Sequence, residues 1–287
     1  MRIIAVLFIC FSIHWGLSQT DSIKVLSWNV FLRPAILKDG QAKRADSIAA
    51  YLSASGADVL ILQEVFHRRA RKKLVQALSS DYSNFTKIGP VSFWGVSSGV
   101  MIASKDSILS TKHLSFKKGT GADKMAKKGG VAATIIHNSS KVHIVGTHLQ
   151  AGRGKDKESI RRRQVKKLKR LSEKIKDLRD APIIYAGDFN IPFGSDNFEF
   201  LKDTLNVACK KPMSDVKATS NFSDCNLYPV EGKPKWIDFV LIEKGQQLKT
   251  LECYIEEPRA VYGKSKERRR LSDHNAIINV ISISNDN

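Results

Sequence analysis

The stretch YAGDFNIP, residues 185–192, places a carboxylate and a carboxamide two residues apart, at Asp188 and Asn190. They follow the apolar residues 183–185 and a glycine, which is the pattern of a buried strand that ends on polar groups. Alternate side chains of a strand share a face, so this spacing predicts that Asp188 and Asn190 point toward the same place. Buried polar groups need partners, and the pattern therefore indicates a site.

Similar polar groups end or precede other apolar runs. They are Asn29 in VLSWNV, Glu64 in LILQEVF, His148 in HIVGTHLQ, Asp238 in KWIDFVL, and Asp273 with His274 in RLSDHNAII. Any one of them alone is more often a satisfied structural hydrogen bond than a site. Together they predict one acidic pocket that also contains two histidines.

The residue types of this pocket suit a particular chemistry. Asn29, Glu64 and Asp273 supply hard oxygen ligands, which suit Mg²⁺ or Mn²⁺ rather than zinc. His148 and His274 are far apart in the sequence and suit acid and base roles. A divalent ion would offset the repulsion between the carboxylates and an anionic substrate. The set is typical of metal-assisted phosphoester hydrolysis.

Strands and helices must position these groups. Apolar runs rich in Val and Ile predict strands at 25–30, 59–62, 99–103, 131–136, 142–146, 183–186, 236–242 and 276–283. Periodic apolar residues predict helices near 42–54, 66–79, 158–179 and 195–205. Strands run consecutively in the middle while helices cluster elsewhere. This order favours an α+β sandwich of stacked sheets with helices outside over a regular βαβ repeat.

The N-terminal residues differ from the rest of the chain. Arg2 precedes an apolar run at 3–11, and small residues follow at Gly16 and Ser18, which is the layout of a secretory signal. The run is too short to span a bilayer comfortably. We therefore expect a signal peptide at 1–18 and one catalytic domain at 19–287, exported, soluble and monomeric.

The formal net charge is +19, which draws a chain toward nucleic acid, anionic lipid headgroups or other polyanions. Part of the excess lies in residues 153–179, where apolar residues at three-to-four-residue spacing predict an amphipathic helix with a solvated basic face. Beyond the expected signal, Cys209, Cys225 and Cys253 allow several disulfide pairings or none. None lies in a CxxC pattern, so a zinc site is not expected.

The ordered series SWNV, LQEVF, THLQ, GDFN, WIDFV and SDHNAI resembles the endonuclease/exonuclease/phosphatase superfamily of metal-dependent phosphodiesterases, over essentially all of residues 22–283. The segments 97–109, 119–135 and 147–151 resemble the secreted neutral sphingomyelinases of bacteria. The resemblance implies the four-layer αββα sandwich of two mixed sheets that deoxyribonuclease I also has. It also implies that water attacks the phosphorus of sphingomyelin, or of a related sphingophospholipid, and releases ceramide and phosphocholine.

The resemblance implies a role for each polar residue. Glu64 is then the principal metal ligand, with Asn29 and Asp273 beside it or reached through water. His274 resembles the general base that activates water together with Asp188.

The remaining roles follow from the same motifs. Asp238 should orient His274, as a carboxylate fixes the tautomer of a catalytic imidazole. Asn190 should hold a non-bridging phosphoryl oxygen, and His148 should stabilise the transition state or protonate the leaving alkoxide. Lys128 is a candidate phosphate contact, although a surface lysine is the simpler interpretation.

The chain departs from these sphingomyelinases where they carry an exposed aromatic hairpin that enters the membrane. Residues 245–271 contain no tryptophan; Tyr254, Val261 and Tyr262 remain as apolar candidates, and Arg268–Arg270 add charge. We therefore expect peripheral membrane contact that is more electrostatic than insertive. Phe93 and Trp94 are candidates for lipid or choline contact, and equally for the core.

Two other functions remain open. A secreted nuclease of the same fold would explain the positive charge through phosphate contacts, although nucleic acid is the less favoured partner. A catalytically silent lipid-binding module is a different class. Every expected catalytic position is filled, which disfavours that module.

Overall fold

The structure is a computed structural model that describes residues 21–89, 97–116, 119–120, 123, 128–176, 181–245 and 247–284. The expected signal peptide at 1–18, and Phe93 with Trp94, lie outside the described residues. Within the described ranges, no helix has both the length and the apolar character needed to cross a bilayer.

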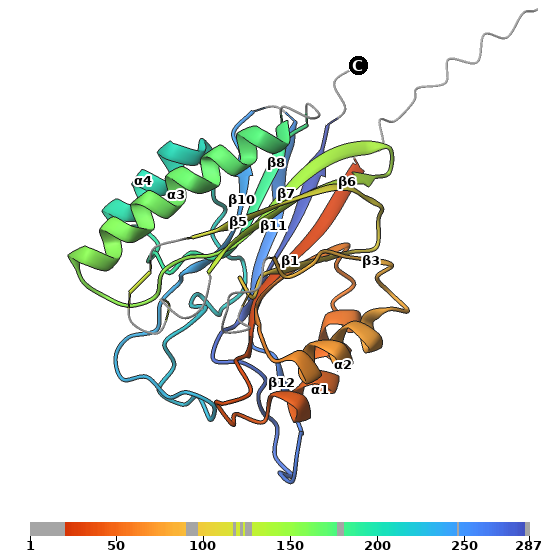
Figure 1. The fold of residues 1–287 in the computed structure, drawn as a ribbon, viewed down its shortest axis with the longest axis vertical. Helices are drawn as coiled ribbons and strands as arrows, with labels where there is room; N and C mark the ends of the chain where they lie inside the picture. Colours follow the sequence, from red (N-terminus) through yellow and green to blue (C-terminus); the bar gives the residue numbers. More distant parts are fainter. Residues whose placement is uncertain are drawn as a thin grey trace, which may run out of the picture.

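Two six-stranded mixed sheets stack face to face between helices (Figure 1). The first sheet has the spatial order β11 (Leu248–Glu256), β14 (Ala276–Ile283), β1 (Asp21–Leu32), β2 (Val59–Val65), β4 (Met101–Ser104) and β3 (Asn84–Phe85). The second has the order β5 (Ile108–Ser115), β6 (Gly129–His137), β7 (Ser140–His148), β8 (Ile183–Asp188), β10 (Asp238–Glu243) and β9 (Val207–Ala208). The expected α+β fold of two packed mixed sheets is confirmed.

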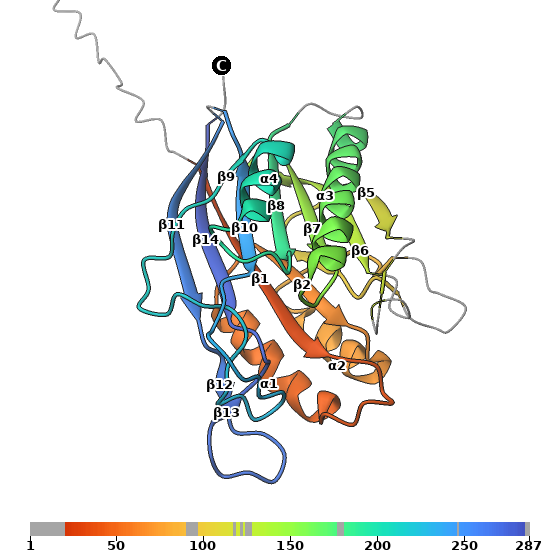
Figure 2. The same cartoon turned by 90° about the vertical axis from the view of Figure 1, so that its left-hand side faces the viewer.

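Helices cover the outer faces of both sheets. They are α1 (Gln41–Ala54) and α2 (Arg68–Leu78) beside the first sheet, and α3 (Lys155–Lys176) and α4 (Asp196–Leu205) beside the second. In Figure 1 the two pairs lie at lower right and upper left, with the sheets between them. Side chains cap two of these helices: His67 Nδ1 accepts from Ala70 N–H at 3.1 Å, and Ser195 Oγ accepts from Phe198 N–H at 3.3 Å. A short ribbon, β12 (Arg259–Ala260) with β13 (Arg269–Arg270), extends beyond the first sheet (Figure 2).

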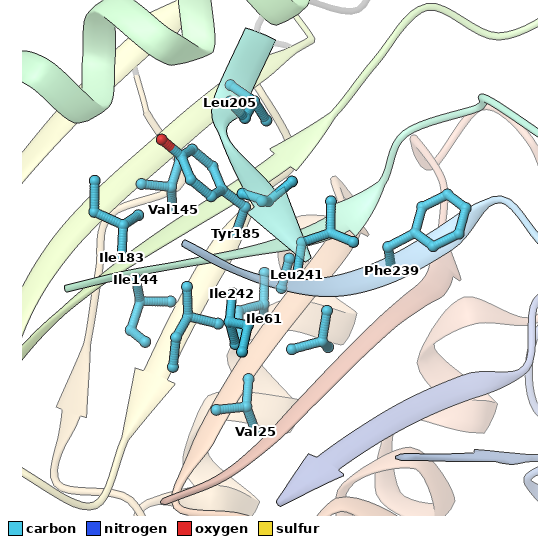
Figure 3. Packing of buried hydrophobic residues seen from close by; sticks show 14 of the residues in the cluster. Val25, Ile61, Ile144, Val145, Ile183, Tyr185, Leu205, Phe239, Leu241 and Ile242 are labelled. Carbon is cyan, nitrogen blue, oxygen red and sulfur yellow. The ribbon is translucent and has the colours of Figure 1, made fainter. Parts of the chain in front are cut away.

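The alternation of strand side chains divides the core into two layers. On β1, Ile23 and Val25 face the second sheet, while Leu26 and Trp28 face α1 and α2. Figure 3 shows Val25 among the buried side chains between the sheets. Each such fully buried aliphatic side chain contributes about 1.5–3 kcal/mol. This packing holds the ends of the strands of both sheets in a defined relation, which is what a site between them requires.

The sequence did not reveal all strands. β5 and β11 were not predicted, because both lie at sheet edges and alternate exposed or half-buried residues with few fully buried ones. The predicted helix at 158–179 begins earlier, at Lys155, and its described part ends at Lys176. Residues 177–180 lie outside the described part of the chain.

Candidate active site

Three polar residues form a row across the end of the second sheet. β7 and β8 pair in parallel with His148 opposite Asp188, and β8 and β10 pair antiparallel with Asp188 opposite Asp238. Residues opposite each other in a sheet present their side chains on one face. His148 Nε2 consequently lies 3.2 Å from Asp188 Oδ2, and all three side chains are buried.

Gly187 lets β7 and β8 approach closely enough to form this row. Its φ is +145°, which L side chains rarely adopt, and a Cβ at this position would overlap the Thr147 carbonyl oxygen. The glycine of the GDFN motif is thus required by the backbone. It brings Asp188 beside His148.

The first sheet contributes Asn29 and Glu64. Asn29 lies on the face of β1 that points to the second sheet, and its Nδ2 donates to Glu64 Oε1 at 3.3 Å and to Asp188 Oδ2 at 3.2 Å. In a regular strand, Glu64 would share the opposite face with Leu60 and Leu62. Its φ of +57° breaks the alternation and turns its side chain toward Asn29. The two sheets therefore meet in hydrogen bonds at the site.

His274 lies in the loop that precedes β14. Its Nδ1 lies 2.8 Å from Asp238 Oδ2, and its Nε2 lies 3.8 Å from Asp188 Oδ2 and 3.3 Å from Ser220 Oγ. Trp28 Nε1 donates to the His274 carbonyl at 2.9 Å, which fixes the loop to β1. Asp238 is thus placed to accept a hydrogen bond from Nδ1–H, which leaves Nε2 facing the site.

The carboxylates around His274 control its charge. Burial lowers the pKa of His274, but the carboxylates of Asp238, Asp273 and Asp188 outweigh burial and raise the pKa well above its ordinary value. Burial raises the pKa of Asp238, while the nearby His274 opposes that rise. The two groups therefore form a buried, hydrogen-bonded pair in which Nδ1–H donates to the Asp238 carboxylate.

Asp188 and Asp273 respond in opposite directions. Burial raises the pKa of Asp188, but His148 and His274 overcome it and hold the pKa well below its usual range. Burial and the charges of Glu64 and Asp188 raise the pKa of Asp273 to about 7. Carboxylates therefore crowd together at Asp273, and a bound cation would relieve their repulsion.

These donors fit a divalent ion. In the described residues, Asp188, Asp238 and His274 form a compact group whose potential ligand atoms lie within 4.8 Å of one another. This group differs from the set predicted from sequence, Asn29, Glu64 and Asp273. His274 Nδ1 is already bound to Asp238, and the charge of Glu64 is among the causes that raise the pKa of Asp273, so carboxylate oxygens also gather at Glu64 and Asp273.

The position of Asn190 differs from the sequence-based expectation that it shares a strand face with Asp188. β8 ends at Asp188, and Asn190 follows with a φ of +52°, so the two-residue period of a strand does not set its direction. Instead a tight turn holds it: its N–H donates to Asp188 Oδ1 at 2.9 Å, and its Nδ2 donates to the Leu149 carbonyl at 3.2 Å. Asn190 lies at the site because of this turn.

Lys128 is the residue whose importance the sequence understated. The surface interpretation is wrong, because Lys128 is buried and its Nζ lies 2.8 Å from His148 Nε2. It also donates to the Leu149 carbonyl at 3.0 Å and pairs with Asp123 Oδ1 at 3.1 Å. The only sequence signal was its place in the segment 119–135. It adds a positive charge beside His148.

The segment 245–271 also differs from expectation. Tyr254 lies on β11, and Tyr262 is buried, with its hydroxyl donating to the Arg270 carbonyl at 3.1 Å. Arg270 is itself buried and paired with Asp224 and Glu257. Of the three apolar candidates, only Val261 is exposed. Cys209, Cys225 and Cys253 are free thiols.

Comparisons with known proteins agree with this geometry. Residues 26–274 match the Endonuclease/Exonuclease/phosphatase family. A protein named phospholipase C from Staphylococcus aureus is 29% identical over 273 residues, covering 84% of this chain and 80% of that protein. A sphingomyelinase C from Listeria ivanovii is 28% identical over 262 residues, covering 81% and 78%.

Solved structures resemble the fold closely. The crystal structure of SmcL has a TM-score of 0.76 at 25% identity and covers 90% of this chain and 98% of that one. A beta toxin variant from Staphylococcus aureus with bound magnesium ions has a TM-score of 0.77 at 26% identity, covering 92% and 100%.

Proposed function

The chain belongs to the endonuclease/exonuclease/phosphatase family, and from that premise we propose that it is a secreted, Mg²⁺-dependent phosphodiesterase that cleaves sphingomyelin or a related sphingophospholipid. The observation that carries the proposal is the meeting of two sheets at Asp188. Asn29 donates to it from the first sheet, and His148 and His274 lie beside it. The names and the identities of the curated relatives support the lipid substrate.

His274 is the general base in this proposal. Asp238 holds its Nδ1 and leaves Nε2 directed at the space near Asp188. A water in that space can donate one proton toward His274 Nε2 and the other toward Asp188. The water oxygen then attacks phosphorus, and the bond to the ceramide oxygen breaks.

His148, Lys128 and Asn190 act on the charge that develops in the transition state. His148 and the Lys128 ammonium lie together on the far side of Asp188 from His274. They are placed to stabilise the phosphoryl oxygens and to supply the proton that the leaving alkoxide needs. Asn190 has one amide proton free of the Leu149 carbonyl for a phosphoryl oxygen.

Glu64 would hold the divalent ion, with Asn29 and Asp273 beside it. Bound there, the ion would neutralise phosphate charge and polarise the P–O bonds. Burial, together with the charges of Glu64 and Asp188, raises the pKa of Asp273 to about 7, and this repulsion, which a cation would relieve, supports the proposed site. Magnesium in a related beta toxin structure supports the choice of metal.

A membrane surface is the proposed partner. Large apolar side chains are exposed on two loops near the site and on the adjoining ribbon. The exposed fractions are 86% for Ile36, 42% for Leu37, 51% for Tyr228 and 51% for Val261. The loops and the ribbon are joined, since Tyr228 lies 6.3 Å from the Phe31 ring and Asn226 Nδ2 donates to the Tyr262 hydroxyl at 2.8 Å. Exposed Lys38, Lys264, Lys266 and Arg268 surround these tips. Such an edge suits shallow docking on an anionic bilayer.

A secreted nuclease of the same fold is the second candidate, and the net charge of +19 is the observation that favours it. The two candidates differ in substrate and share the metal and the base. The experiment that tests the first is product analysis. Hydrolysis of sphingomyelin in heavy-oxygen water should place the label in phosphocholine and none in ceramide, and only with Mg²⁺. Choline as the released product would refute the bond assignment.

A further inference from the structure

Contacts hold Arg33 in place just beyond the end of β1, the strand that carries Asn29. It directly follows β1, and its guanidinium carbon lies 4.2 Å from the centre of the buried Phe31 ring and 5.6 Å from that of Tyr228. Its Nε donates to Asp39 Oδ2 at 2.7 Å. Three contacts thus fix the plane of one side chain that is still partly exposed to solvent.

These contacts leave the outer end of the guanidinium available. Asp39 binds Nε alone, and within the described part of the chain neither terminal nitrogen of Arg33 has a hydrogen-bond partner. The two terminal nitrogens carry four protons in a planar fork, the geometry that matches two oxygens of a phosphate.

The stack is coupled to the proposed metal ligands. The N–H of Phe31, whose ring supports Arg33, donates to Asn29 Oδ1 at 3.1 Å. Burial lowers the pKa of Arg33, but Asp39 outweighs it, and the charges of Glu64 and Asp273 raise the pKa further. Arg33 is therefore within the electrostatic range of both carboxylates.

We propose that Arg33 contacts the substrate phosphoryl group and shares its negative charge with the divalent ion. The proposal adds a residue to the proposed reaction and therefore rests on the proposed function. Phe31 and Tyr228 act as positioning residues, since they hold the guanidinium plane without touching the phosphate. Asp39 has the same role through Nε. The fixed geometry lowers the entropy that a free arginine would lose on binding.

Binding of inorganic phosphate to the Mg²⁺-loaded protein tests this without catalysis. Arg33→Ala should weaken phosphate binding about 10- to 100-fold, the scale of a charge-assisted pair of hydrogen bonds, and should lower kcat/KM similarly. Free guanidinium should restore part of both in Arg33→Ala, whereas urea, which has the same shape and no charge, should not. The matched control is Arg162→Ala, which removes an arginine of α3 whose guanidinium carbon lies 4.7 Å from the centre of the Phe200 ring on α4.

Each outcome decides the proposal. Wild-type phosphate affinity in Arg33→Ala, equal recovery with urea, or an equal loss in Arg162→Ala would overturn it. If Arg33→Ala does not fold, Arg33→Lys and Asp39→Asn replace it, and both should weaken phosphate binding without changing the Mg²⁺ affinity. A wild-type protein that binds phosphate through Arg33 yet leaves sphingomyelin intact would refute the proposed substrate alone.

Discussion

Asp188 is the residue at which the polar groups of both sheets converge. It accepts from Asn29 Nδ2 at 3.2 Å and lies 3.2 Å from His148 Nε2 and 3.8 Å from His274 Nε2. The two histidines keep its pKa far below the usual range, so it stays ionised throughout the pH range of catalysis. In the proposed mechanism, an acceptor of constant charge at this position orients a water while His274 takes the proton.

Asp238 should set the pH at which the base becomes active. His274 can accept a proton only when Nε2 is unprotonated, and the Asp238 carboxylate raises the His274 pKa. Asp238→Asn removes that charge and lowers the pKa. The acidic limb of the kcat/KM profile should move to lower pH, while the maximum should fall by about a hundredfold or more. A limb at the wild-type pH would show that His274 is not the titrating base.

Glu64 should carry most of the metal affinity. Glu64→Gln keeps the shape of the side chain and removes one charge of the crowded carboxylates. We expect much weaker Mg²⁺ binding by calorimetry and loss of most turnover. Without metal, the melting temperature should match or exceed that of the wild type, because repulsion with Asp273 is relieved. Unchanged Mg²⁺ affinity would place the ion elsewhere.

At the scale of elements, the ends of strands position the site. The sequence predicted which strands end on polar groups, because buried strands leave a strong apolar signal. It did not predict how Glu64 and Asn190 reach the site, because positive φ angles at these residues break the strand period. Nor did it predict Lys128 beside His148, since that contact depends on the pairing of β6 with β7. The local pattern of apolar residues indicates which residues are buried, whereas the pairing of distant segments determines where each side chain points.

Arg44 on α1 joins two elements of the site. It is fully buried and donates to the carbonyls of Val30 at 3.2 Å, Phe31 at 2.6 Å and Leu271 at 2.5 Å. It thereby ties the end of β1, which carries Asn29, to the loop that carries Asp273.

Arg44→Met should loosen this junction. Leaving the buried carbonyls without a donor should lower the free energy of unfolding by about 3 kcal/mol or more. Mg²⁺ affinity should fall as well, since Asn29 and Asp273 lose their common support. The control is Lys43→Met, at an exposed position one residue earlier, which should change neither. Denaturant titration and calorimetry measure both effects, and normal Mg²⁺ affinity in Arg44→Met would contradict the link.

For the whole molecule, the sequence predicted the sandwich from the order of its elements and missed edge strands that carry few buried residues. It also predicted membrane contact at 245–271, but the structure buries Tyr262 of that segment and exposes Ile36 and Leu37 in the loop after β1. Ile36 is 86% exposed there, whereas Tyr262 is 9% exposed. Exposure depends on how distant segments pack, so sequence alone could not assign it.

The double variant Ile36→Ser with Leu37→Ser should weaken binding to anionic vesicles by about tenfold or more, the scale of one or two apolar side chains. Turnover on vesicles should fall with it, while turnover in detergent micelles should not change. The matched control replaces Leu109 and Leu251, exposed leucines on the edge strands β5 and β11, with serine. Equal losses in both double variants would mean that the loop after β1 is not the docking edge.

The most direct test of the central claim is a side-by-side assay of sphingomyelin and plasmid DNA, with Mg²⁺ and with excess chelator. Wild type and Glu64→Gln are compared in each. We expect Mg²⁺-dependent release of phosphocholine by the wild type, its loss in Glu64→Gln and in chelator, and no substantial nicking of DNA. Efficient plasmid nicking with inert sphingomyelin would contradict the lipid substrate, and full activity in excess chelator would contradict the metal.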